Sequence, residues 1–216
     1  MRTNAPIRFD RSRGSTNTWR ALVCALPLFS ACGGATLSHV VQRRMLRDVS
    51  RQGQLTVYDA ENETVIALDQ LDEAEDALRD TRQQLRLAGR SVDRAERRNS
   101  APGIQLAEAW VDYLEQLRDW SEEQVELRRL GLLVARAAIE LTKAQVVQRE
   151  DLPGGKDFAL KDFRKQHERL QLRFERETKR LKSLRERARQ KELRWWELRR
   201  RVVAQTGDHN TALWVD

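Results

Sequence analysis

Thiol and imidazole side chains, two of the types that carry out chemistry in enzymes, are few in this 216-residue chain. The only two cysteines, Cys24 and Cys32, could act as thiol nucleophiles, pair as a disulfide or bind zinc, but both lie in the first 32 residues. The three histidines, His39, His167 and His209, are too few to assemble a histidine-based relay easily. No Gly-rich phosphate loop, HExxH pair, CxxC pair, GxSxG elbow or EF-hand loop occurs. We therefore expect a protein that is not an enzyme and holds no metal or cofactor.

The first 31 residues have the layout of an export signal. They contain five arginines and one aspartate, and a short apolar run, Ala21–Phe29, follows the last arginine. A membrane span needs roughly 20 apolar residues, so this run is too short to remain in a bilayer as a span. Residues 1–31 are therefore predicted to be a signal peptide.

The apolar run leads into Leu28-Phe29-Ser30-Ala31-Cys32, which resembles the lipobox of bacterial lipoproteins. Ser30, Ala31 and Cys32 match the pattern, whereas Phe29 stands where that family usually has Leu. The resemblance implies cleavage before Cys32 and acylation of this cysteine, with chains such as palmitate. Because Gly33 rather than Asp follows, it also implies the outer membrane, on its periplasmic side. An ordinary secretory signal that is cleaved elsewhere, with Cys32 incidental, is the alternative.

Removal of the signal would change what the remaining chain can do. The net charge is +7 for the whole chain and +3 for the part after residue 31. With Cys32 acylated, no free thiol would remain, which excludes a disulfide framework, a cysteine-based zinc site and a thiol nucleophile. Two or more acyl chains hold a protein stably on a membrane, where a single chain does not.

Gly, Pro and Asn cluster at only a few places after the signal, and these clusters divide the chain. The long stretches between them are rich in Ala, Leu, Glu, Arg and Gln, which favour helices. The predicted order is an acylated lead-in or tether at 32–56, helices at about 57–98, 104–150 and 157–204, and a loose tail at 205–216.

Apolar residues recur at seven-residue spacing in all three segments, which is typical of a coiled coil. The first segment adds a row of small residues, which would let a partner helix approach closely. The second has the widest apolar arc, which predicts a central helix with two neighbours. In the third, Trp195 falls in the seam and Trp196 outside it. The rows are Val57, Thr64, Leu71, Leu78, Leu85 and Val92 with Ala60, Ala67, Ala74, Thr81, Ala88 and Ala95; Leu106, Tyr113, Trp120, Leu127, Val134 and Leu141; and Leu160, His167, Phe174, Leu181, Ala188, Trp195 and Val202.

Linkers of about four to six residues make sequential helices antiparallel neighbours. The sequence therefore predicts an all-α fold, an elongated antiparallel three-helix coiled coil over residues 57–204. Each helix would be roughly 60 to 70 Å long. Three amphipathic helices can close into a monomer or leave a seam for a second copy, and the sequence leaves this open.

Charge differs between the segments, with −4 in residues 56–99, −4 in 104–151 and +10 in 155–201. Complementary charges along the seams of a coiled coil would explain this distribution. The other hypothesis is that the surplus positive charge meets anionic lipid headgroups, lipopolysaccharide or an acidic partner. The candidate residues for such a contact are Arg173, Arg176, Lys179, Arg180, Arg187 and Trp196.

These observations favour a lipid-anchored envelope protein that works as a coiled-coil scaffold, spacer or interaction arm. Its expected partners are the membrane, through the lipid, and a protein of the envelope or a second copy, with no small-molecule substrate. The alternative is a basic coiled-coil protein that binds nucleic acid or another polyanion through residues 161–201. The export signal and the net charge of only +3 after its removal argue against nucleic acid.

Overall fold

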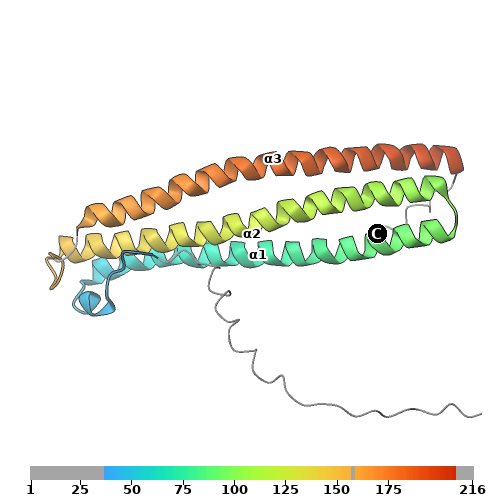
Figure 1. Cartoon of the computed structure of the whole chain (residues 1–216). Helices are drawn as coiled ribbons and strands as arrows, with labels where there is room; N and C mark the ends of the chain where they lie inside the picture. The colour runs from blue at the N-terminus through green and yellow to red at the C-terminus, as the bar shows by residue number, and fades with distance from the viewer. Residues whose placement is uncertain (1–36, 157–158, 208–216) are drawn as a thin grey trace, which may run out of the picture. The chain divides into compact units, whose positions relative to one another are not determined.

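The computed structural model describes residues 37–156 and 159–207 (Figure 1). They form a short 3-10 helix, η2 (Arg43–Leu46), and three long helices, α1 (Arg51–Arg97), α2 (Ala101–Arg149) and α3 (Leu160–Thr206). No strand occurs in this part of the chain, so the predicted all-α, three-helix fold is confirmed. The chain from Leu37 onward forms one compact unit by its own contacts. The predicted signal peptide, Cys32 and residues 208–216 of the predicted tail lie outside the described residues.

Capping residues mark the starts of α1 and α2 and the end of α3. The Ser50 hydroxyl accepts a hydrogen bond from the Gly53 N–H at 3.1 Å, so α1 begins six residues earlier than predicted. The Ser100 hydroxyl caps α2 in the same way, with Pro102 in the first turn. Gly207 ends α3 in the left-handed conformation that glycine adopts without strain. Heptad spacing alone does not locate such caps, which explains the shifted boundaries.

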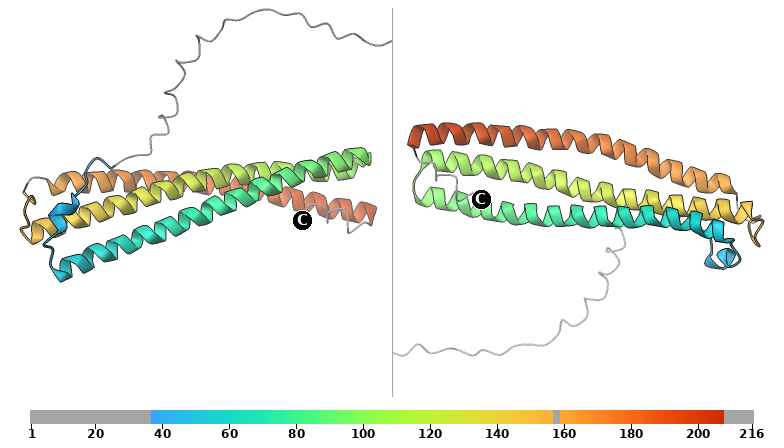
Figure 2. Two further views of the ribbon diagram at one scale, coloured as in Figure 1. Left: turned by 90° about the horizontal axis from the view of Figure 1, so that it is seen from below. Right: turned by 180° about the vertical axis from the view of Figure 1, so that it is seen from behind.

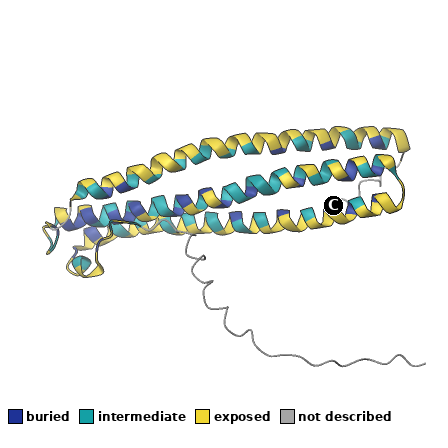
Figure 3. Ribbon diagram, viewed as in Figure 1, coloured by how far each residue is buried: buried dark blue, intermediate teal, exposed yellow. Residues whose placement is uncertain are grey.

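Helix α2 lies in the middle of the three long helices, as the sequence predicts, and the arrangement is open. Figures 1 and 2 show α2 between α1 and α3, each antiparallel to it. Helix α2 packs against both, whereas no pair of Cα atoms from α1 and α3 comes within 8 Å. Helices of 47 to 49 residues are about 70 Å long. Each outer helix therefore has one helical neighbour, and Figure 3 shows most of the buried residues on α2.

The seam between α1 and α2 is built from small side chains. The buried residues of α1 are Gly53, Ala74, Thr81, Ala88, Ser91 and Ala95, which include four of the six members of the predicted small-residue row. The Leu-type row of α1 is only half-buried, because α3 does not close over it. The heptad therefore identifies the seam correctly but predicts more burial for this second row than it has.

The seam between α2 and α3 carries the large aromatic residues. Trp195 is 3% exposed and packs with the fully buried Leu106, while Trp110 lies 4.5 Å from it between ring centroids. Trp196, 42% exposed, lies outside the seam as predicted. Further along, the Phe174 ring lies over Gly131, where a Cβ would come 3.2 Å from the ring edge. The missing side chain at Gly131 thus lets Phe174 sit close to α2.

Residues 37–50 lie against the bundle as an ordered lead-in. The Val41 side chain is buried in a cluster with Ala144, Val147 and Phe163. The Val41 N–H donates a hydrogen bond of 2.6 Å to the buried Glu140 carboxylate. The Lys143 ammonium donates a second one, of 2.8 Å, to the same carboxylate. The sequence left open whether the lead-in is ordered. Its contacts reach residues about 100 positions away, which no local pattern reveals.

Candidate interaction surface on the third helix

Helix α3 carries nearly half of the basic side chains of the described chain and few acidic ones. It holds 17 basic and 7 acidic side chains, whereas α1 holds 7 and 11. Figure 3 shows its outer side as an exposed band. The five basic candidates of the sequence analysis, Arg173, Arg176, Lys179, Arg180 and Arg187, are all exposed. They lie within 15 residues, which is about 21 Å of helix.

Four of these five side chains are free to contact a partner. Arg173, Arg176, Lys179 and Arg187 form no ion pair or hydrogen bond with any other described residue. Arg173 and Arg187 fall in the same seven-residue row as Arg180, so they project from one side of the helix. An exposed cluster of like charge without internal counterions attracts polyanions and is screened by salt.

Arg180, in contrast, is engaged within the chain. Its guanidinium donates to Glu123 of α2 at 3.0 Å and lies 3.8 Å from Glu177 of its own helix. Lys191 forms the other ion pair between α3 and α2, at 3.0 Å from Asp112. Both cations lie beside the seam between α2 and α3. Complementary charge along this seam is the simpler explanation for the basic character of α3. It accounts for these two cations and not for the remaining surplus.

The sixth candidate, Trp196, lies apart from the basic cluster. It follows Arg187 by nine residues and packs against Trp195, with ring centroids 4.7 Å apart in an edge-on arrangement. The Arg199 guanidinium lies 5.0 Å above the Trp196 ring and 5.5 Å from the Trp195 ring, within cation–π range. Trp196 therefore belongs to an aromatic cluster near the C-terminal end of α3. The structure does not bring Trp196 together with the five basic candidates.

A groove that sequence reasoning missed runs between α2 and α3. Its volume is about 510 Å³, and Tyr113, Leu117 and Trp120 of α2 line it together with Lys182, Arg185 and other residues of α3. The Arg185 guanidinium lies 5.7 Å above the Trp120 ring. Burial first, and then the nearby Glu192 carboxylate, raises the pKa of Tyr113. Tyr113 and Trp120 lie seven residues apart in a row that the sequence predicts to be core. In the structure both side chains are half-buried. How closely α3 packs over them is not encoded in the seven-residue spacing.

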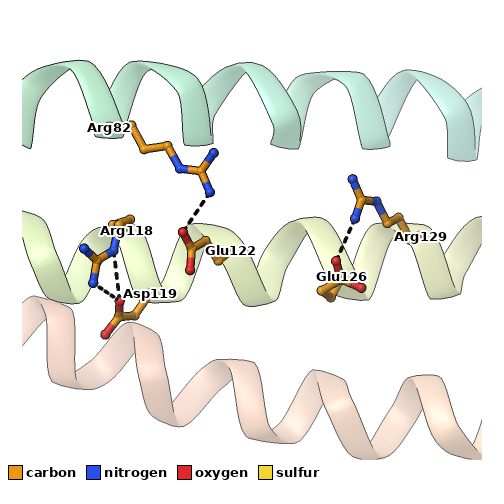
Figure 4. A network of polar contacts seen from close by, with 6 residues as sticks. All are labelled: Arg82, Arg118, Asp119, Glu122, Glu126 and Arg129. Atoms are coloured by element: carbon orange, nitrogen blue, oxygen red, sulfur yellow. Dashed lines mark hydrogen bonds and ion pairs between the residues drawn. The ribbon is translucent and has the colours of Figure 1, made fainter. Parts of the chain in front are cut away.

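A charged network on the other outer helix ties α1 to α2 (Figure 4). Arg82 of α1 donates to Glu122 of α2 at 2.9 Å, and Arg129 of α2 donates to Glu75 of α1 at 2.9 Å. The bond to Glu75 raises the pKa of Arg129. Exposed pairs of this kind contribute about 0.2 to 1 kcal/mol each. These two ion pairs link α1 and α2, which both have a net negative charge. Each pair joins an arginine of one helix to a glutamate of the other.

The described residues contain no group of three or more His, Cys, Asp or Glu side chains placed to hold a metal ion. In the same part of the chain, no helix combines the length and the apolar character that crossing a membrane requires. No protein-family model, curated protein or solved structure matches this chain. The case for a function therefore depends on its residues and their arrangement.

Proposed function

We propose that the chain is a lipid-anchored protein of the bacterial envelope, held through Cys32 on the periplasmic side of the outer membrane. The proposed role is that of a non-enzymatic scaffold, spacer or interaction arm. The observation that carries the proposal is the lipobox-like sequence Leu28–Cys32, which precedes a short lead-in and three helices of 47 to 49 residues. Helices of that length give an anchored protein a reach of about 70 Å.

The arrangement of the charged residues supports a role in interaction rather than catalysis. The acidic and basic side chains that the structure brings together on α1 and α2 pair with one another, as Arg82 with Glu122 and Arg129 with Glu75. Many of the charged side chains on α1 and α3 form no ion pair and face solvent, among them Asp69, Asp72, Arg173 and Arg187. Exposed charges on long helical surfaces are suited to recognising another surface.

Metabolic labelling with a clickable fatty acid tests the anchor directly. We expect wild-type chain to take up the label and to fractionate with the outer membrane, because the Cys32 thiol would be the acylated atom. Cys32→Ala should lose all label. Cys24→Ala is the matched control, since it removes the other cysteine, within the apolar run, and should keep the label. An unlabelled wild type, or a labelled Cys32→Ala chain, would contradict the proposal.

The second candidate function is binding of nucleic acid or another polyanion through α3. The observation that favours it is the set of four exposed basic side chains without a counterion in the described chain, at residues 173, 176, 179 and 187. Each cation that contacts a phosphate releases counterions, so the binding constant falls steeply with salt.

A four-residue neutralisation tests this second function. Arg173→Gln, Arg176→Gln, Lys179→Gln and Arg187→Gln together should weaken binding of a fluorescent DNA duplex at least tenfold. They should also flatten the slope of log affinity against log salt by about 3.6 if all four residues contact phosphates, because each lost contact removes about 0.9 from it. The control carries the same charge change at four other exposed basic residues, Arg43, Arg44, Arg47 and Lys156. Equal loss in both variants, or no binding by wild type, would argue against a defined surface on α3.

A further inference from the structure

The outer side of α1 is an exposed edge with a polarised charge distribution. Residues 59–76 hold eight acidic side chains and no basic one, whereas residues 79–97 hold six arginines and three acidic side chains. This edge lies opposite the buried row of Ala74, Thr81 and Ala88, and α3 does not reach it. One half of the edge is thus negative and the other half positive.

Acidic and basic residues lie at matching distances on either side of Arg79, which stands beyond the midpoint of α1. Asp72 and Arg86 lie seven residues before and after Arg79. Asp69 and Arg90 are also symmetric about this point to within one residue. Glu75 and Arg82 follow the same pattern, but they are already paired with α2. Within each pair the two residues are 21, 14 or 7 positions apart, so they share a row of the helix surface.

Such symmetry has a geometric consequence. In two antiparallel helices related by a two-fold axis at Arg79, each residue before the axis faces the residue equally far behind it on the other helix. Asp69 and Asp72 of one chain would then face Arg90 and Arg86 of a second chain, and the reverse. This is the self-complementary contact that a two-fold interface requires.

Two further observations direct this contact to α1. Among the described residues, ten large apolar side chains are exposed, and six of them are on α1: Leu55, Tyr58, Val65, Ile66, Leu68 and Leu87. Asp69, Asp72, Arg86 and Arg90 are exposed and form no ion pair in the described chain, so they are available to a partner. Helix α3, with its net charge of +10, would repel a second copy of itself.

We propose that α1 is a self-association surface, on which a second copy of this chain binds through its own α1, antiparallel and related by a two-fold axis near Arg79. Opposite charges in the facing rows set the orientation, since a parallel pairing would oppose acid to acid and arginine to arginine. Val65, Ile66, Leu68 and Leu87, which are exposed within the length over which the two helices would overlap, add buried area. This inference does not depend on the lipid anchor.

Light scattering after gel filtration tests the proposal on residues 37–216, which form a compact unit by their own contacts. We expect wild type to have the mass of two chains at low ionic strength, about 0.05 M, and to dissociate as salt screens the pairs. Asp69→Lys with Asp72→Lys makes the edge basic, and Arg86→Glu with Arg90→Glu makes it acidic. Each double variant should be monomeric when alone. An equimolar mixture of the two should restore a two-chain species, because the basic edge of one then faces the acidic edge of the other.

The control is Arg44→Glu with Arg47→Glu, which changes the charge by the same amount in the lead-in and should leave the dimer intact. Circular dichroism shows whether each variant keeps its helices, so that loss of the dimer is separated from loss of the fold. A monomeric wild type, dimers that persist in both double variants, or an open-ended polymer formed by α1 of one chain on α3 of the next would each overturn the proposal. Retained fatty-acid labelling in any of these cases leaves the anchor proposal standing.

Discussion

Replacing Trp195 by Ala should lower the free energy of unfolding by about 3 to 5 kcal/mol, the range for removing a buried aromatic side chain. The Trp195 ring is 3% exposed, packs on Leu106 and contacts the rings of Trp110 and Trp196 at 4.5 and 4.7 Å. It is the largest buried side chain that α3 contributes to its seam with α2. Because α3 packs against no other long helix, this loss falls on its only seam with one.

Urea denaturation of residues 37–216, followed by circular dichroism, measures this effect. Trp196→Ala is the matched control, since the adjacent ring is 42% exposed, and it should change stability by no more than about 1 kcal/mol. Trp195→Phe should cost far less than Trp195→Ala. It keeps an aromatic ring and removes an indole N–H that is buried without a hydrogen-bond partner in the structure. Similar losses for Trp195→Ala and Trp196→Ala would mean that the two rings share the seam.

The difference between Trp195 and Trp196 also shows what the sequence could predict. Heptad spacing placed Trp195 in a seam and Trp196 outside it, and the structure confirms both positions. The same spacing predicted the three helices, the central place of α2 and the small-residue row of α1. All of these depend on which side of a helix is apolar, and seven-residue periodicity encodes that property directly.

Other features depend on contacts between distant parts of the chain, and periodicity does not encode those. The Leu-type row of α1 follows the heptad as well as the small-residue row does, yet it is half-buried because α3 packs on the other side of α2. The lead-in is joined to Glu140 through the Val41 N–H, across 99 positions. For the candidate surface, the sequence correctly gathered five exposed basic residues. It could not show that Arg180 is engaged by Glu123 or that Trp196 belongs to another cluster.

The open arrangement connects the fold to the two proposals. Because α1 and α3 do not meet, one molecule presents two different outer edges, a charge-polarised one on α1 and a basic one on α3. An antiparallel pair with its axis near Arg79 would place the two Arg51 ends roughly 85 Å apart, at 1.5 Å per residue. The α3 edges would then remain free on both sides of the pair.

Gly53→Ala is expected to destabilise the protein by about 1 to 3 kcal/mol, the cost of inserting a group into a packed site. The direction is diagnostic, because Ala is normally favoured over Gly within a helix by about 0.5 to 1 kcal/mol. A Cβ at Gly53 would lie 2.6 Å from Cγ1 of Val49 and 2.8 Å from Cγ1 of Val146, and would also meet the Glu150 carboxylate. That carboxylate accepts two hydrogen bonds of 2.7 Å from Ser50, which lower the pKa of Glu150 and fix the start of α1 against the end of α2.

Gly89→Ala is the matched control on the same helix. A Cβ at Gly89 meets no atom within 4 Å, so only the helix preference acts, and stability should rise by about 0.5 to 1 kcal/mol. The two substitutions are chemically identical and should therefore shift the urea midpoint in opposite directions. A gain in stability at both positions would show that α1 and α2 can move apart at Gly53 without a loss of stability. The close approach there would then not be what holds the first turn of α1 against the end of α2.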